Sequence, residues 1–214
     1  MSNYSFVSSY TLKTEVFMPD STPILKETLL LWAIEKVGYL GRYKLVSILE
    51  LPDGVTRGLL TRLATKGYVK RNKFVGTSLT TKGKNHLGEL LSKRSIREIA
   101  EIDAGDLGFP RTSAAAHIRG GAALVHSGIE QRDAAIRSGA VGAITMIFHG
   151  GKLLLPPDLS DASKKNRRIT DQLKTRFKLS EGDVLIIGSA NSRWRAVEGV
   201  LRAAETLTQS NINR

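Results

Sequence analysis

The chain has 214 residues, a net charge of +12 and no cysteine. Its apolar fraction of 41% is enough to bury a core, so wholesale disorder is not expected. The lack of cysteine excludes disulfides, thiolate metal ligands and a cysteine nucleophile. The N-terminus lacks the basic and apolar regions of a signal peptide, and the longest apolar run, residues 29–34, is too short to span a bilayer. We therefore expect a soluble, cytoplasmic protein with no membrane partner, folded as one large or two small domains.

The basic charge is concentrated in the first part of the chain. Residues 1–95 carry 15 basic and 7 acidic side chains, a net +8, whereas residues 96–214 carry 17 and 13, a net +4. Concentrated positive charge favours a nucleic-acid partner. A generally basic, solvated surface is the alternative.

Residues 1–22 are polar and weakly patterned, and we interpret them as an N-terminal arm. Residues 23–38 have the apolar spacing of an amphipathic helix, with Trp32 in its core face. Glu27 and Glu35 are predicted on the opposite, solvent-facing side.

Two further helices and a hairpin follow. Residues 43–49 predict a short helix, and leucines at helical spacing predict a third, up to Gly67, which can end it in a left-handed cap. An extended run from Tyr68 to Leu79 turns back on itself near its middle. Thr80 suits the N-cap of a fourth helix over 82–91. This is the order of elements in a winged helix-turn-helix.

Between residues 54 and 88 the chain has eight Lys or Arg and no Asp or Glu. One-signed charge on a helix and an adjoining hairpin is what a phosphate backbone requires. In this motif the third helix enters the major groove by its N-terminal half, where Arg57 and Arg62 are the best candidates for base or phosphate contacts. A merely solvated hairpin tip is the alternative. The predicted DNA-binding residues are Thr56, Arg57, Thr61, Arg62 and Lys66 on the helix and Lys70, Arg71 and Lys73 on the hairpin.

The segments LLTRLATKGYVKR and SLTTKGKNHL resemble winged-helix transcription regulators of the multiple-antibiotic-resistance and diphtheria-toxin repressor kinds. The resemblance covers about residues 24–93 and implies a DNA-binding domain over 23–94. Winged helices also serve as protein-interaction modules, so the resemblance alone leaves that alternative open.

Composition changes after residue 95, with more Ala and Gly, and residues 95–214 predict a compact α/β sandwich domain. The whole chain is thus expected to have an α+β fold. In the predicted helix 128–139, Ile129, Ala134 (or Asp133) and Ile136 are expected on one, inward side. The predicted strands are 96–102, 114–118, 140–148, 152–155 and 184–187, and the predicted helices are 128–139, 169–178 and 193–207.

A candidate ligand site lies at VLIIGSANS, which reads as a strand, a tight turn and a helix N-terminus. Such a turn can present backbone N–H groups to a small anion. No dinucleotide or P-loop fingerprint is present. An ordinary turn with an exposed Arg132–Asp133 helix pair is the alternative. The predicted ligand-binding residues are Arg119, Arg132, Asp133, Gly188, Ser189, Asn191 and Arg193.

Catalysis is not expected. The four histidines do not have metal-ligand spacing, and we find no paired carboxylates and no nucleophile elbow. We therefore predict no enzyme activity, no metal and no cofactor.

The second half resembles an archaeal domain of unknown function found behind a winged helix. The shared segments are GIEQRDAAIRSGAVGAITMIF, GGKLLLP and EGDVLIIGSA, within about residues 96–207. This resemblance implies architecture rather than activity. The sequence as a whole predicts a homodimeric, DNA-binding transcription regulator whose second domain senses a small anionic metabolite, dimerises, or both. An enzyme acting on a phosphorylated small molecule, or an RNA- or protein-interaction module, are the alternatives.

Overall fold

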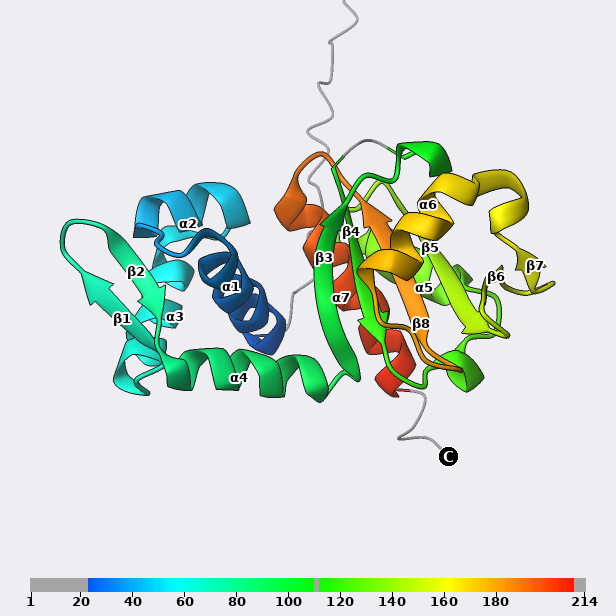
Figure 1. Ribbon diagram of the computed structural model, residues 1–214. Helices are drawn as coiled ribbons and strands as arrows, with labels where there is room; N and C mark the ends of the chain where they lie inside the picture. Colours follow the sequence, from blue (N-terminus) through cyan, green and yellow to red (C-terminus); the bar gives the residue numbers. More distant parts are fainter. Residues whose placement is uncertain (1–22, 110–111, 210–214) are drawn as a thin grey trace, which may run out of the picture.

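The computed structural model describes residues 23–109 and 112–209, and shows a mixed α/β molecule built in two parts (Figure 1). The coarse expectation of an α+β fold is confirmed. The predicted arm, residues 1–22, lies outside the described residues. Within the described residues, no helix combines the length and apolar character needed to cross a bilayer.

The first part is helical, with one two-stranded hairpin, and its elements lie where the sequence predicts them. They are α1 (Pro23–Val37), α2 (Arg42–Leu49), α3 (Asp53–Thr65), β1 (Val69–Asn72), β2 (Gly76–Leu79) and α4 (Thr81–Ser92).

Local chemistry explains the ends of α3 and α4. Gly67 has φ of +72°, and the N–H of Tyr68 donates to the carbonyl of Leu63 at 2.9 Å, as in a Schellman cap. Thr80 is the N-cap of α4, because its Oγ1 accepts from the N–H of Gly83 at 3.0 Å. The helix–hairpin–helix order is therefore fixed by short-range interactions.

The second part is a six-stranded antiparallel sheet with helices on both faces (Figure 1). The strand order is β3-β4-β8-β5-β6-β7. Helices α5 and α7 cover one face and α6 covers the other. The elements are β3 (Ile96–Ile102), η1 (Gly105–Leu107), β4 (Ser113–Ile118), η2 (Ala122–Leu124), α5 (Ile129–Arg137), β5 (Gly142–His149), β6 (Lys152–Leu155), β7 (Ser160–Asp161), α6 (Ser163–Arg176), β8 (Val184–Ser189) and α7 (Arg193–Gln209).

The two parts share one apolar cluster, because α1 packs against α7. The rings of Trp32 on α1 and Trp194 on α7 meet edge to face with centroids 5.9 Å apart. Between α4 and β3, where the chain passes from the first part to the second, the buried Arg94 pairs with Glu205 of α7 at 2.9 Å. It also donates to the carbonyl of Leu90 at 2.9 Å. Helix α7 is thus in direct contact with the helical part near both its start and its end.

Two helix faces differ from expectation. Glu27 is buried rather than solvent-facing, with only 9% of its surface exposed. On α5, Ile129 and Ile136 are about half exposed, whereas Ala134, also expected on the inward side, is buried together with Ala135. Small residues face inward there because α5 packs closely against α7, where a Cβ at Gly199 would lie 3.6 Å from the Cβ of Ala135.

Candidate functional site

The candidate nucleic-acid interface is the basic surface of α3, the β1–β2 hairpin and the start of α4. Of the eight basic side chains between residues 54 and 88, two are held by acids of α1. Arg62 Nη2 lies 2.8 Å from Glu27 Oε2, and Lys84 Nζ lies 3.3 Å from Glu35 Oε1. The other six are exposed and, among the described residues, have no carboxylate within ion-pair distance: Arg57, Lys66, Lys70, Arg71, Lys73 and Lys82.

Arg62, a predicted leading DNA contact, is therefore drawn partly inward by Glu27, although 45% of its side chain stays exposed. Glu27 also accepts a hydrogen bond from His86 Nε2 at 2.8 Å. Burial raises the pKa of Glu27, but the hydrogen bonds from His86 and Arg62 outweigh it and hold the pKa below its usual value. Glu27 stays ionised at neutral pH and neutralises one of the eight cations.

Thr56 is a second correction, because it is fully buried rather than turned outward. It lies on the same side of α3 as Leu59 and Leu60, which form part of the core. Its hydroxyl oxygen has no hydrogen-bond partner among the described residues. Thr56 therefore packs the helix and is not available to DNA.

Thr61 and Arg71 connect α3 to the hairpin. Arg71 Nη2 donates to Thr61 Oγ1 at 3.1 Å, so a predicted helix residue and a predicted hairpin residue lie side by side. Lys66 and Lys82 approach the ring of Tyr68, with their amino groups 6.0 and 5.4 Å from its centroid. These contacts gather the cations of three elements around one surface.

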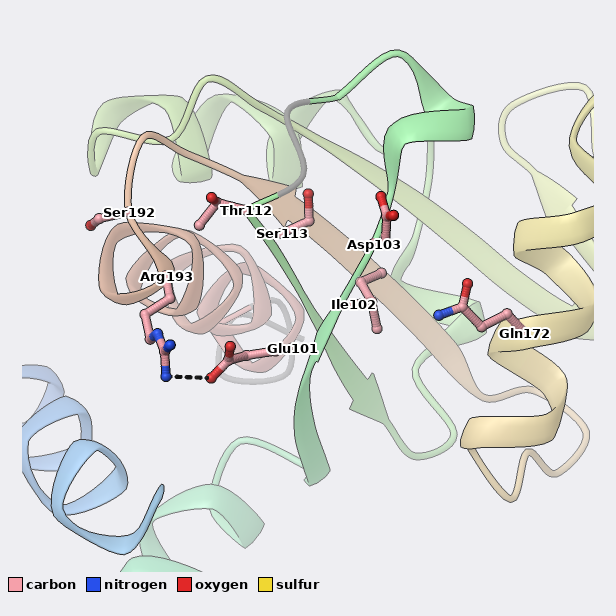
Figure 2. Close-up of a pocket in the computed structure, with 8 residues that line it drawn as sticks. All are labelled: Glu101, Ile102, Asp103, Thr112, Ser113, Gln172, Ser192 and Arg193. Carbon is pink, nitrogen blue, oxygen red and sulfur yellow. Dashed lines mark hydrogen bonds and ion pairs between the residues drawn. The ribbon is translucent and has the colours of Figure 1, made fainter. Parts of the chain in front are cut away.

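A pocket of about 530 Å³ lies in the second part, where β3 ends and β4 and α7 begin (Figure 2). Arg193, in the first turn of α7, pairs with Glu101 of β3 at 3.3 Å across one side of it. Gln172 of α6 closes the other side (Figure 2). The lining residues are Glu101, Ile102, Asp103, Thr112, Ser113, Gln172, Ser192 and Arg193.

The side chains that line this pocket are mostly polar, but they do not form a simple anion-binding site. Its one guanidinium is already paired with Glu101, and Asp103 adds a second carboxylate. Asp103 Oδ1 accepts from the N–H of Gly105 at 3.0 Å. Two carboxylates, hydroxyls and an amide suit a ligand that donates hydrogen bonds, such as one bearing an amine or several hydroxyls.

Of the seven predicted ligand-binding residues, the pocket contains Arg193. Gly188 and Ser189 do not form the predicted turn: they are the buried last residues of β8, paired with β4 on one side and β5 on the other. Arg119 follows the far end of β4, about 20 Å along the strand from Ser113. The structure therefore keeps Arg119 away from the pocket, whereas Ser189 lies beside the lining residues Thr112 and Ser113.

The remaining predicted ligand residues lie on the surface. Arg132 Nη2 and Asp133 Oδ1 pair with each other at 3.1 Å on α5, which is the alternative expected from the sequence. Asn191 is exposed in the turn before α7. Glu101, Asp103 and Gln172 were not predicted, because their approach to Arg193 depends on contacts between distant segments.

A buried titratable pair lies apart from both sites. His117 Nε2 is 2.7 Å from Asp183 Oδ2, and both side chains are almost fully buried. Burial raises the pKa of Asp183, but hydrogen bonds from the Ser180 N–H, His117 and the Gly120 N–H together lower it below its usual value. The pair ties β4 to the 180–183 turn and lines neither site. Within the described residues no three His, Asp or Glu side chains are placed to hold a metal ion.

Comparison with known proteins finds similarity to a domain of unknown function over part of the chain. The family model described as a domain of unknown function (DUF4443) matches residues 110–207, which span β4 to α7. A similar solved structure is a hypothetical protein from Pyrococcus horikoshii OT3, with 24% identity, a TM-score of 0.69 and coverage of 90% of this chain and 96% of that chain. No curated protein matches the sequence. These findings fit an archaeal protein of unknown function and support the fold of both parts.

Proposed function

We propose that residues 23–94 form a winged helix that binds double-stranded DNA and that the protein is a transcription regulator. The observation that carries this proposal is a set of six exposed cations that have no acid partner among residues 23–109 and 112–209: Arg57, Lys66, Lys70, Arg71, Lys73 and Lys82. We call this set the free cations. We call the β1–β2 hairpin with its turn, Val69–Leu79, the wing.

The free cations are arranged as expected for a surface that binds the phosphate backbone of DNA. Arg57 lies in the N-terminal half of α3, the part of a recognition helix that reaches into the major groove. Lys70, Arg71 and Lys73 extend along the wing, which projects from the same side as α3 (Figure 1). Charge of one sign on two adjoining elements favours binding to a backbone rather than to a single anion.

We further propose that the second part regulates this binding. Three consecutive residues at the start of α7 connect the pocket to the helical part. Arg193 lines the pocket, Trp194 meets Trp32 of α1, and Arg195 Nη2 lies 2.6 Å from Glu50 Oε2 at the end of α2. A ligand that moves the first turn of α7 would therefore act on the helices that support α3. The exposed Ile129 and Ile136 of α5 give the same part a surface for a second copy in a homodimer.

The test compares two triple variants of the full chain. Lys70→Ala, Arg71→Ala and Lys73→Ala together should weaken binding to duplex DNA and flatten its dependence on salt by about 3 × 0.9 in log–log slope. The matched control replaces three exposed lysines on and after α6, Lys164, Lys165 and Lys178, which have no ion pair within the described residues.

An equal loss of DNA affinity in both triple variants, or no loss of affinity in the wing variant, would contradict the assignment of the wing as a DNA-binding element. Competition of duplex RNA against duplex DNA at the same salt separates DNA from RNA as the partner, since RNA would be bound by shape across its minor groove. Stronger competition by RNA would favour the RNA-binding alternative.

A further inference from the structure

The turn of the wing presents two exposed apolar side chains. Phe74 is 90% exposed and Val75 is 54% exposed. Isolated exposed apolar residues are common on protein surfaces, so exposure alone assigns no role. The rigidity and the charge of the surrounding wing set this pair apart.

The wing turn is held rigidly. Asn72 Oδ1 accepts from the N–H of Phe74 at 2.8 Å and from the N–H of Val75 at 3.2 Å, which fixes the turn. At the other edge of β2, Leu40 and Thr77 exchange two backbone hydrogen bonds, at 3.0 and 2.9 Å, and so join the wing to the helical body. The backbone that carries Phe74 thus has little conformational freedom to lose on binding.

Gly76 makes this close attachment possible. Its φ is +105°, and a Cβ there would lie 2.7 Å from the carbonyl carbon of Leu40. No other residue fits that position without moving the wing away from the body. The four paired positions between the wing base and its turn span about 13 Å of strand, more than the depth of about 7.5 Å of a DNA minor groove.

The neighbours of Phe74 indicate what it meets. Lys70, Arg71 and Lys73 precede it closely on the wing, and no acid occurs between residues 54 and 88. An apolar ring among phosphate-binding cations matches a partner with phosphates outside and stacked rings inside. Duplex DNA has that arrangement, and minor-groove proteins insert apolar side chains between its base pairs.

We propose that Phe74 is a wedge that enters the minor groove beside the α3 site and partly unstacks one base step, which bends the duplex. This inference rests on the proposed DNA-binding function. It also gives a physical reason why the protein prefers some DNA sequences to others. Flexible pyrimidine–purine steps such as TA unstack at the lowest cost, whereas A-tracts are stiff. The wedge therefore makes the protein prefer DNA with a TA step at the position of the wing.

The experiment uses the full chain and two short duplexes of equal length. One carries 2-aminopurine in place of the adenine of a central TA step, and the other carries it in an A-tract; each has a donor and an acceptor dye at its ends. The wild-type protein should brighten 2-aminopurine and shorten the end-to-end distance on the TA duplex, and do so less on the A-tract. Phe74→Ala should abolish both signals and weaken binding to the TA duplex about tenfold, with its salt slope unchanged.

Two further variants control the result. Phe74→Leu keeps an apolar side chain and should retain part of the brightening. Val141→Ala removes an exposed apolar side chain of the second part, to which no role in binding is assigned, and should behave as wild type. Because Phe74 is exposed, Phe74→Ala should unfold at the wild-type temperature, which a thermal melt verifies.

Wild-type protein that binds both duplexes without brightening or bending would overturn the wedge and leave DNA binding intact. Equal brightening by wild type and Phe74→Ala would also overturn it. Binding of phosphatidylserine vesicles that depends on Phe74, without DNA distortion, would assign the ring to a membrane surface instead. Absence of any binding to either duplex at low salt would overturn the proposed function and the wedge together.

Discussion

Two basic regions of this molecule differ in how their charges are paired. Helix α6 carries six cations, of which Arg168 pairs with Asp106, Arg176 with Glu98, and Arg167 and Lys174 with Asp171. Between residues 54 and 88, by contrast, two of the eight cations are paired within the described part of the chain, and six have no acid partner there. A count of Lys and Arg alone therefore does not identify a nucleic-acid surface. The acids supplied by other elements determine which cations remain available.

The largest expected effect separates the two arginines of α3. Arg57→Glu should lower DNA affinity about tenfold, because it removes one phosphate contact and adds a repulsion, and should leave Tm unchanged. Arg62→Glu should place two carboxylates together and lose the bonds to Glu27, which costs about 2 kcal/mol and lowers Tm by roughly 5 °C. Thermal melts and salt titrations of both variants check this. An unchanged Tm in Arg62→Glu, with affinity lost as in Arg57→Glu, would mean that Arg62 faces DNA.

A second prediction concerns variants in which the cations of α6 lose their acid partners. The hydrogen bonds from Arg168 hold the pKa of Asp106 below its usual value, so Asp106 is charged at neutral pH and neutralises Arg168. Asp106→Asn with Asp171→Asn releases Arg168, Arg167 and Lys174. Non-specific DNA binding should then acquire a salt slope steeper by about 2 to 3.

Asp158→Asn is the matched control for that double variant, since Asp158 is exposed and has no ion pair within the described residues. It should change the slope by less than the double variant does. Identical slopes in the control and the double variant would show that pairing is not what keeps α6 from binding DNA.

The third and smallest effect concerns the acid that holds Arg62. The folded-state pKa of Glu27 lies below the usual 4.5, so its contribution to stability is present above pH 4.5 and is lost as pH falls through the lowered pKa. Glu27→Gln should therefore cost about 1–2 kcal/mol near pH 7 and progressively less toward pH 3. Glu35→Gln, which breaks the more exposed pair with Lys84, should cost only a few tenths of a kcal/mol. Tm measured from pH 3 to 7 tests both; a Glu27→Gln deficit that grows at low pH would contradict the sign.

Short-range patterns predicted much of the fold. The end of α3 at Gly67 and the cap of α4 at Thr80 depend on neighbours within a few residues, so the sequence could reveal them. The pairing of β5 with β6 follows likewise from a local turn. In the same way, the one-signed charge of residues 54–88 is visible without any structure.

Long-range contacts account for what the sequence did not reveal. Leu29, Leu30 and Leu31 are consecutive and all buried, because α1 packs against both its own part and α7. A helix enclosed on several sides has no solvent face for Glu27, so its periodicity gave the wrong orientation. The same holds for the pocket, where Arg193 meets Glu101 from a strand that lies 92 positions earlier in the chain.

The most direct test of the free-cation account is a salt titration of wild-type affinity for random-sequence duplex DNA. Six phosphate contacts predict that log K falls against log salt with a slope of about −5. A slope near that value would support a phosphate-binding surface formed by α3, the wing and the start of α4. A slope close to zero, or no binding at low salt, would contradict the account and direct the search for function to the pocket at the start of α7.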